Sequence, residues 1–244
     1  RALYMTGNST RLAAEAVRER FVARAAKAFG VDASQIKLAN NVVSVENHPD
    51  RSMPFSELVR ICAAEGIRRN ELAMFRAPFT DKLDPETGQG QAHPDYTFGA
   101  HAVEVAVDVE TGEVTVLKSV ACHDVGQCIN PAAVEGQIEG GAAQGQGYAL
   151  SEEMIYRNGK LATPSFSEYL IPTAMDVPKV KSIILESRSG VGPFGAKGIG
   201  EPSLTPVAPA IANAVADAIG VRIHDLPITP EKVVRTLNWK DGAG

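Results

Sequence analysis

The segment from Gly192 to Pro206 constrains this chain most, because it places four glycines, a lysine and a glutamate just before an alanine-rich stretch. Glycine allows backbone N–H groups to approach a bound group closely, and the first turn of a helix leaves N–H donors unpaired. The helix dipole adds partial positive charge at the same end. The sequence therefore predicts a loop and a helix start that hold an anionic ligand, with Glu201 facing that ligand.

Length and composition are typical of a soluble globular protein. The 244 residues can bury a sizeable core, and 44% of them are hydrophobic while 22% are charged. A net charge of −5 gives no general attraction to nucleic acids or acidic membranes, so we expect neither as a partner. No apolar run approaches the roughly 20 residues that span a bilayer.

The cysteine content favours a reducing compartment. Cys62, Cys122 and Cys128 are too few and too scattered for a disulfide scaffold or a four-cysteine iron–sulfur site. We therefore expect a cytoplasmic location. Cys122 and His123 would point to opposite faces of a strand, which favours core packing over a shared metal site.

The first part of the chain predicts an α+β unit. A helical apolar stripe indicates a helix over 11–29, capped by Asn8 or Ser9. Apolar residues around an Asn-Asn pair predict a short hairpin over 35–47, and a second helix is expected over 56–66.

A long connection separates two parts of the chain. Residues 78–94 are rich in Pro, Asp, Thr and Gly and lack apolar periodicity, which favours a surface loop. We place a boundary near Asp95, with one α+β lobe over 1–95 and a second over 96–244. The second lobe carries the glycine-rich loop. Its expected elements are hairpins over 102–120 and 154–161, a strand over 180–188, and helices over 132–152, 203–219 and from Thr229.

The helix expected over 132–152 is unusual, because each glycine inside it costs up to about 1 kcal/mol relative to alanine. Its glycines are Gly136, Gly140, Gly141, Gly145 and Gly147. Close packing against another helix or sheet would account for them, and so would backbone approach to a ligand. In the second case, Gln137 and Gln144 would supply amide donors. The residues alone leave both explanations open.

Four blocks of the sequence, in the same order, resemble the large subunit of the molybdenum hydroxylases, the xanthine dehydrogenase and aldehyde oxidoreductase family. The blocks are 96–114, 122–131, 134–153 and 192–206, the last with a Gly-x-Gly-Glu motif ending at Glu201. The resemblance covers most of the chain and is strongest from Tyr96 to Gly220. It identifies the chain as similar to the C-terminal half of that subunit.

This resemblance implies an α+β fold with mixed sheets and packed helices that binds molybdopterin, the molybdenum cofactor. No protein ligand to the metal is implied. The implied cofactor contacts, several of them through main-chain N–H groups, are Gln137, Gln144, Lys197, Gly198, Ile199 and Gly200. Glu201 is implied as the partly buried general base in the oxidation of an aldehyde or N-heterocycle, with water as the oxygen source.

The resemblance also implies partners. The family's large subunit has an upstream half without a counterpart here, and its iron–sulfur clusters and flavin are expected on other chains or domains. We therefore expect this chain to act with the N-terminal half of the molybdenum subunit, with iron–sulfur and flavin subunits or domains, and on a small-molecule substrate. It would be a separate subunit or a fragment.

Two other functions compete with this one. A non-catalytic assembly or binding module could complete a partner subunit without using Glu201. A nucleotide-binding enzyme ranks last, because the glycine-rich loops lack a Gly-Lys-Ser/Thr phosphate motif.

Other titratable residues favour structural roles. His101 and His224 have no partner visible in the sequence. Helix-surface charge accounts better than a paired-carboxylate site for a group of acidic residues, namely Glu135, Glu139, Glu152 and Glu153. Taken alone, Glu201 would be a helix-dipole charge worth about 0.3–1 kcal/mol.

Overall fold

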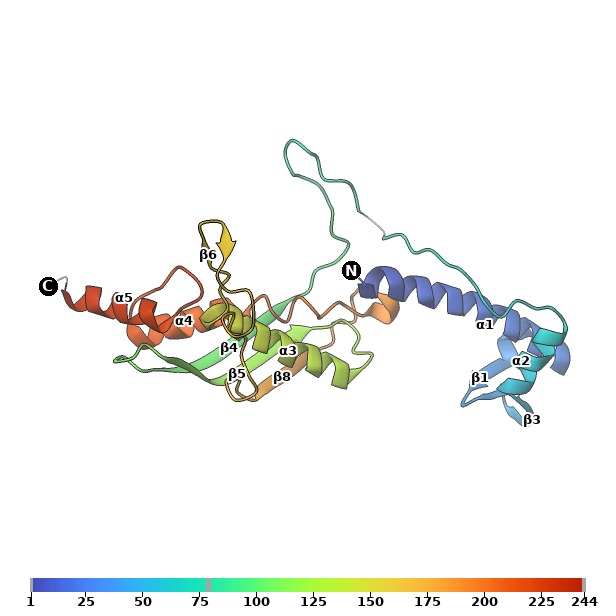
Figure 1. The fold of residues 1–244 in the computed structure, drawn as a ribbon. Coiled ribbons are helices and arrows are strands. Elements are labelled where there is room, and N and C mark those ends of the chain that lie inside the picture. Colours follow the sequence, from blue (N-terminus) through green and yellow to red (C-terminus); the bar gives the residue numbers. More distant parts are fainter. Residues whose placement is uncertain (1, 78–79, 243–244) are drawn as a thin grey trace. The chain divides into compact units, whose positions relative to one another are not determined.

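The structure, a computed structural model, describes residues 2–77 and 80–242. The chain divides into two compact units, Arg1–Ala92 and His93–Gly244, and each has its own hydrophobic core (Figure 1). This division lies close in sequence to the boundary predicted at Asp95. Both units combine helices with a sheet, and one sheet has antiparallel and parallel pairs, so the predicted α+β class with mixed sheets is confirmed.

The first unit packs two helices against a three-stranded sheet. Helix α1 (Asn8–Phe29) follows a π-helical turn (Leu3–Gly7) and ends at Gly30, which adopts the left-handed conformation with φ 62°. The remaining elements are a 3-10 turn (Ala33–Gln35), the antiparallel strands β1 (Ile36–Ala39), β2 (Val42–Val45) and β3 (His48–Pro54), and helix α2 (Phe55–Ala64). The hairpin and both helices predicted here are therefore present.

Two details of this unit differ from prediction. Neither Asn8 nor Ser9 caps α1, because the π-helical turn continues directly into the helix. The Ser9 hydroxyl instead accepts a hydrogen bond from the N–H of Phe75 at 3.0 Å. Strand β3 was not predicted, because its residues are mostly polar and exposed and show no apolar alternation.

The second unit is built on a three-stranded sheet with two helices on one face (Figure 1). Strand β4 (Gly99–Val107) pairs antiparallel with β5 (Val114–Asp124), which pairs in parallel with β8 (Val180–Leu185). The two helices are α3 (Pro131–Leu150) and α4 (Val207–Ile219). The other described elements are β6 (Tyr156–Arg157), β7 (Lys160–Leu161), a 3-10 turn (Pro193–Gly195) and α5 (Pro230–Gly242).

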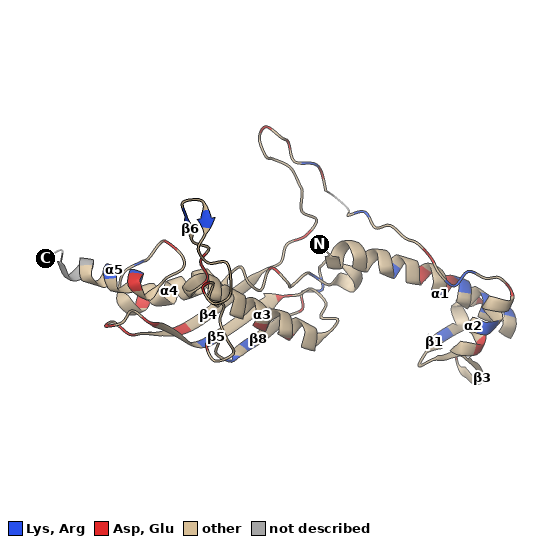
Figure 2. Ribbon diagram, viewed as in Figure 1, with Lys and Arg blue, Asp and Glu red and all other residues tan. Residues whose placement is uncertain are grey.

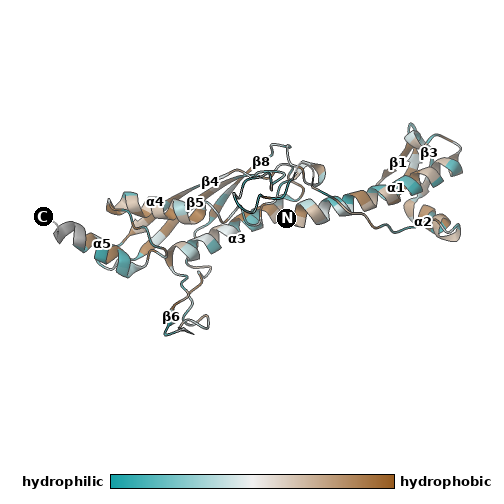
Figure 3. Ribbon diagram, turned by 90° about the horizontal axis from the view of Figure 1, so that it is seen from above, coloured by the Kyte–Doolittle hydropathy of each residue, from teal (hydrophilic) through white to brown (hydrophobic). Residues whose placement is uncertain are grey.

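Helix α4 supplies much of the core of this unit. Its buried residues Val207, Ile211, Val215 and Ile219 recur at every fourth position and form one stripe that packs on β4 and β5. Figure 3 shows hydrophobic colour along these elements. Residues 201–206 form turns, so α4 begins later than position 203. The prolines in this stretch explain the delay, since proline lacks the N–H that a helix interior needs.

Charge is distributed unevenly over the helices. Lys, Arg, Asp and Glu gather on α1 and α2, whereas α3 and α4 carry few charged side chains (Figure 2). No described helix is both long enough and apolar enough to cross a bilayer.

Truncating Ile211 to alanine is expected to lower the free energy of unfolding by about 2–5 kcal/mol, because the side chain is 0% exposed at the centre of the core. Leu117→Ala is the matched control, since Leu117 is 52% exposed on β5 and its truncation should cost less than about 0.5 kcal/mol. Denaturant unfolding followed by circular dichroism measures both. Equal losses in the two variants would contradict this assignment of the core.

Candidate active site

The glycine-rich loop between β8 and α4 folds back against the end of β5. The N–H of Lys197 donates to the carbonyl oxygen of Val125 at 2.8 Å. At Gly126, where φ is 65°, a Cβ atom would lie 2.1 Å from the carbonyl oxygen of Gly195. Glycine at this position thus allows two backbone segments to pack in direct contact.

Lys197 is buried beneath this loop. Its ammonium donates to Oδ2 of Asp124 at 2.7 Å and to the carbonyl oxygen of Tyr96 at 2.9 Å. It also lies 5.7 Å from the centroid of the Phe98 ring, within the range of a cation–π contact. The ammonium and the main-chain N–H of Lys197 both have partners within the chain, and the cofactor contact predicted for Lys197 stays a prediction.

Asp124, at the end of β5, accepts three hydrogen bonds. Burial disfavours its charged form, but hydrogen bonds from Lys197, Gly126 and Ser187 outweigh burial and lower the pKa of Asp124 to about 2. The N–H groups of Gly126 and Ser187 donate to Oδ1 at 2.9 and 3.4 Å. Asp124 is therefore charged at neutral pH and joins the end of β5 to the start of the loop at Ser187 and to its middle at Lys197.

Glu201 lies in the turn that leads into α4, and its side chain is exposed in this chain. The carbonyl oxygen of Glu201 accepts from the N–H of Leu204 at 3.0 Å, and the Ser203 hydroxyl donates to the carbonyl oxygen of Gly200 at 2.7 Å. These bonds fix the backbone on both sides of the carboxylate. The expected partial burial of Glu201 is not provided by the part of the chain that the structure describes.

Four consecutive main-chain N–H groups lie just before and within the turn that leads into α4. The N–H groups of Gly198, Ile199, Gly200 and Glu201 make no hydrogen bond to another described residue. A Cβ atom at Gly198 would meet nothing within 4 Å, so the backbone is open on that side. A row of unpaired backbone N–H groups can bind an anion, although these four lie before the first residue of α4, Val207.

The structure divides the glycines of α3 into two groups. A Cβ atom at Gly141 would lie 2.1 Å from Oγ of Ser203, and one at Gly145 would lie 2.4 Å from Cβ of Val207. Close packing against the α4 region therefore explains these two glycines. Gly147 is also closely packed, because a Cβ atom there would lie 2.7 Å from Cδ of Pro172 and 2.1 Å from Oε1 of Glu152. A Cβ atom at Gly136 or Gly140 meets nothing within 4 Å. Packing within this chain does not explain these two, and they remain candidates for approach by a ligand.

Helix α3 brings one predicted amide to the loop. A Cβ atom at Gly200 would lie 3.3 Å from Oε1 of Gln137, so this side chain lies beside the unpaired donors. Gln144 is also exposed on α3, but two turns of helix, about 10 Å, separate it from Gln137. Ile199 packs partly buried against the cluster that contains Ile138. Gln137 thus lies beside the loop backbone that leads to Glu201, with Gln144 further along the helix.

The partner of His101 was not predicted from the sequence. Nε2 of His101 lies 2.9 Å from Nε2 of buried His123, on the neighbouring strand. Their separation of 22 residues hides the contact in the sequence, although alternation along the hairpin could have placed both on the covered face. Burial, followed by the nearby His123, lowers the pKa of His101 to about 4. Burial also lowers the pKa of His123.

No group of three or more His, Cys, Asp or Glu among the described residues is placed to hold a metal.

The histidine pair predicts a loss of stability in mild acid. The pKa of His101 falls from 6.5 to about 4 on folding, so the unfolded chain binds the extra proton. Stability is complete above pH 6.5 and falls as the pH drops toward 4, by about 1–2 kcal/mol between pH 7 and pH 5 after allowance for partial exposure. Urea unfolding at both pH values measures this loss. His101→Phe should reduce it, whereas the exposed control His224→Gln should not, and an unchanged loss in His101→Phe would contradict the assignment.

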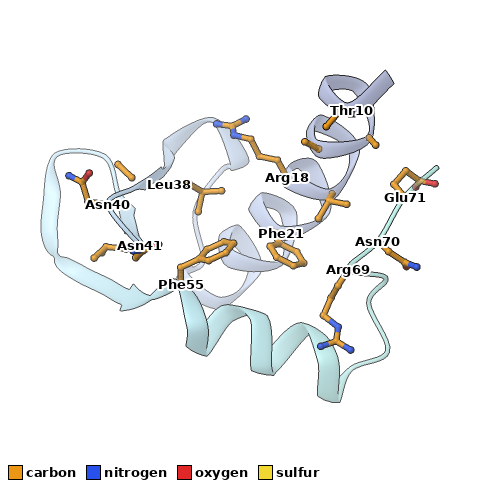
Figure 4. A pocket seen from close by; sticks show the side chains of 15 residues that line it. Thr10, Arg18, Phe21, Leu38, Asn40, Asn41, Phe55, Arg69, Asn70 and Glu71 are labelled. Atoms are coloured by element: carbon orange, nitrogen blue, oxygen red, sulfur yellow. The ribbon is translucent and has the colours of Figure 1, made fainter. Parts of the chain in front are cut away.

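A cavity of about 760 Å³ lies in the first unit, between α1, the β1–β2 turn and residues 69–71 (Figure 4). The rings of Phe21 and Phe55, with centroids 5.7 Å apart, lie in its wall. Glu71, the only carboxylate among the described residues that line it, is paired with Arg20 at 2.9 Å. None of the predicted site residues lines this cavity, and its chemistry does not suit acid–base catalysis.

Known proteins of one family are similar in sequence to this chain over most of its length. The family model for molybdopterin cofactor-binding domains matches residues 1–178. The chain is 32% identical over 236 residues to the xanthine dehydrogenase molybdenum-binding subunit of Escherichia coli O157:H7, which covers 96% of this chain and 30% of that protein. It is 35% identical over 240 residues to the nicotine 6-hydroxylase large subunit of Paenarthrobacter nicotinovorans, with coverage of 96% and 29%.

A solved structure also has a fold similar to that of this chain. Quinoline 2-oxidoreductase from Pseudomonas putida 86 matches with a TM-score of 0.74 and 33% identity, over 92% of this chain and 28% of that chain. The chain thus spans less than a third of the length of each of these three proteins.

Proposed function

Because this chain belongs to the molybdopterin cofactor-binding domains of the molybdenum hydroxylase family, we propose that it carries the general base of such an enzyme. In the proposed reaction an aldehyde or an aromatic N-heterocycle is oxidised, and water supplies the oxygen. One observation supports the proposal, namely the row of unpaired N–H donors over 198–201, which lies beside Gln137 and ends at Glu201.

The residues present fit a polyanionic cofactor. The open backbone at Gly136, Gly140 and Gly198 leaves room for a group to come within contact distance of the main chain. The N–H groups of Gly198, Ile199 and Gly200 and the amides of Gln137 and Gln144 would hold that group. When bound, the cofactor supplies the redox centre at which the substrate carbon is oxidised.

Glu201 would act as the base. Its carboxylate accepts the proton released by the water-derived oxygen, for which an oxygen of the side chain must come within about 2.6–3.2 Å of that atom. The turn around Gly200 and Ser203 holds the backbone of Glu201 without using its carboxylate. The carboxylate is therefore available for this role.

The complete enzyme requires more polypeptide than this chain, since the relatives are more than three times as long. We propose that the N-terminal half of the molybdenum subunit covers Glu201 and shapes the substrate pocket. Iron–sulfur and flavin subunits or domains would carry electrons away. In the assembled enzyme, Glu201 would then be shielded from bulk water, which strengthens its interaction with the reacting groups.

Gln137→Ala is expected to lower the pterin and molybdenum content of the assembled complex several-fold, because it removes the amide beside the loop donors. Glu139→Ala, an exposed change on the same helix, is the control and should leave both contents unchanged. Pterin fluorescence and metal analysis of the purified complex provide the readouts. A complex that contains neither pterin nor molybdenum in its unmodified form would overturn the proposed function.

A non-catalytic assembly role is the second candidate, because large apolar side chains are exposed in the segment after α3. Met154, Phe166 and Met175 are 57%, 76% and 93% exposed. Such side chains suit a surface that a partner covers. If this were the only role, Glu201 would be dispensable for turnover, whereas the proposed function requires it.

A further inference from the structure

The backbone that leads to Glu201 is anchored on both sides. Upstream, Lys197 is buried and its ammonium lies 2.7 Å from Oδ2 of Asp124. Downstream, Ser203 is 0% exposed and packs directly on Gly141 of α3. Only five residues separate these two anchors, and they include Glu201.

We propose that Asp124 and Lys197 are positioning residues that set the direction of the Glu201 carboxylate. This inference rests on the proposed function of Glu201 as the base. It assigns Lys197 a role in holding the loop from beneath, in place of the cofactor contact predicted from the sequence.

The contacts of the pair join three separate segments of the second unit. Asp124 lies at the end of β5 and accepts a hydrogen bond from the N–H of Ser187, just after β8. Lys197 donates to the carbonyl oxygen of Tyr96, just before β4. The Lys197 ammonium also lies 3.8 Å from Oδ1 of Asp95. The main-chain N–H of Lys197 donates to the carbonyl oxygen of Val125, and its ammonium binds Asp124 and Tyr96. Both the backbone and the end of the side chain are therefore held in place.

Stability alone gives no reason for a buried ion pair here. Removing two charges from water costs several kcal/mol per ion, and replacement by apolar side chains of similar volume is often neutral or stabilising. Directional hydrogen bonds, in contrast, define where the lysine backbone lies. Only three residues, Gly198, Ile199 and Gly200, separate Lys197 from Glu201, so a shift of the Lys197 backbone changes where Glu201 lies.

The test measures kcat, KM, molybdenum content and melting temperature of the assembled, cofactor-loaded complex. The decisive variant is the double substitution Asp124→Asn with Lys197→Met, because it removes both charges of the buried pair together and should fold where a single substitution could fail. We expect kcat per molybdenum to fall by at least about tenfold, since a small misplacement of a catalytic group has a large effect on rate. KM and molybdenum content should stay within about twofold of the unmodified values, as expected when only transition-state interactions are lost. Lys181→Met, an exposed change on β8, is the control and should leave kcat unchanged.

The outcomes separate the two proposals. If the double variant keeps the kcat of the unmodified complex per molybdenum, or loses activity only in proportion to lost molybdenum or folded protein, the positioning role is wrong. That result together with an inactive Glu201→Gln variant would leave the proposed function standing. An active Glu201→Gln variant would instead remove the proposed base, whatever the double variant shows.

Discussion

Glu201→Gln is expected to abolish turnover, with kcat reduced by about 10²–10⁴-fold, because an amide cannot accept the proton that the base removes. The substitution keeps the size of the side chain. The backbone of this turn is held by the Ser203 and Leu204 hydrogen bonds, which do not involve the carboxylate. Pterin and molybdenum contents should therefore stay close to those of the unmodified complex.

Steady-state kinetics of the assembled complex, normalised to molybdenum, measure this loss. Glu139→Gln is the matched control, because it makes the same chemical change at an exposed position on α3 and should leave kcat unchanged. Retained turnover in Glu201→Gln would eliminate Glu201 as the base and favour the assembly role. Loss of turnover together with loss of cofactor would show that the carboxylate supports binding instead of proton transfer.

The elements around the site could be predicted from local patterns. Asn130 caps α3 through a hydrogen bond to the N–H of Ala133 at 3.1 Å, as the Asn-Pro pair indicates. The turn at Asn158 and Gly159 has positive φ at both residues, as expected because Asn and Gly tolerate this backbone conformation. Signals of this kind depend on a few neighbouring residues, so one sequence is enough to read them.

The environment of the loop depended on contacts that no local pattern contains. Lys197 meets Asp124 across 73 positions of sequence, and His101 meets His123 across neighbouring strands. A glycine-rich loop with a lysine predicts an anion site, yet the tertiary fold directs the ammonium inward to a carboxylate. The exposed state of Glu201 also could not be predicted, because the burial of one residue depends on the whole fold.

Gly141→Ala and Gly140→Ala form a matched pair that is expected to give opposite results. A Cβ atom at Gly141 would lie 2.1 Å from Oγ, 2.7 Å from Cβ and 2.9 Å from the backbone carbon of Ser203, so the turn that holds Glu201 must move. Overpacking of this kind costs about 1–3 kcal/mol, which exceeds the gain of up to about 1 kcal/mol from alanine in a helix. We therefore expect Gly141→Ala to lower both melting temperature and kcat per molybdenum.

At Gly140 the same methyl group would meet nothing within 4 Å. Gly140→Ala should therefore raise the melting temperature, because only the helix-propensity gain of up to about 1 kcal/mol remains. If the bare backbone at Gly140 serves close approach of the cofactor, the same change should lower molybdenum content. Melting curves and metal analysis of both variants test these expectations. An unchanged molybdenum content in Gly140→Ala would mean that the cofactor does not approach α3 at this position. An unchanged melting temperature and kcat per molybdenum in Gly141→Ala would contradict the close contact between α3 and the turn.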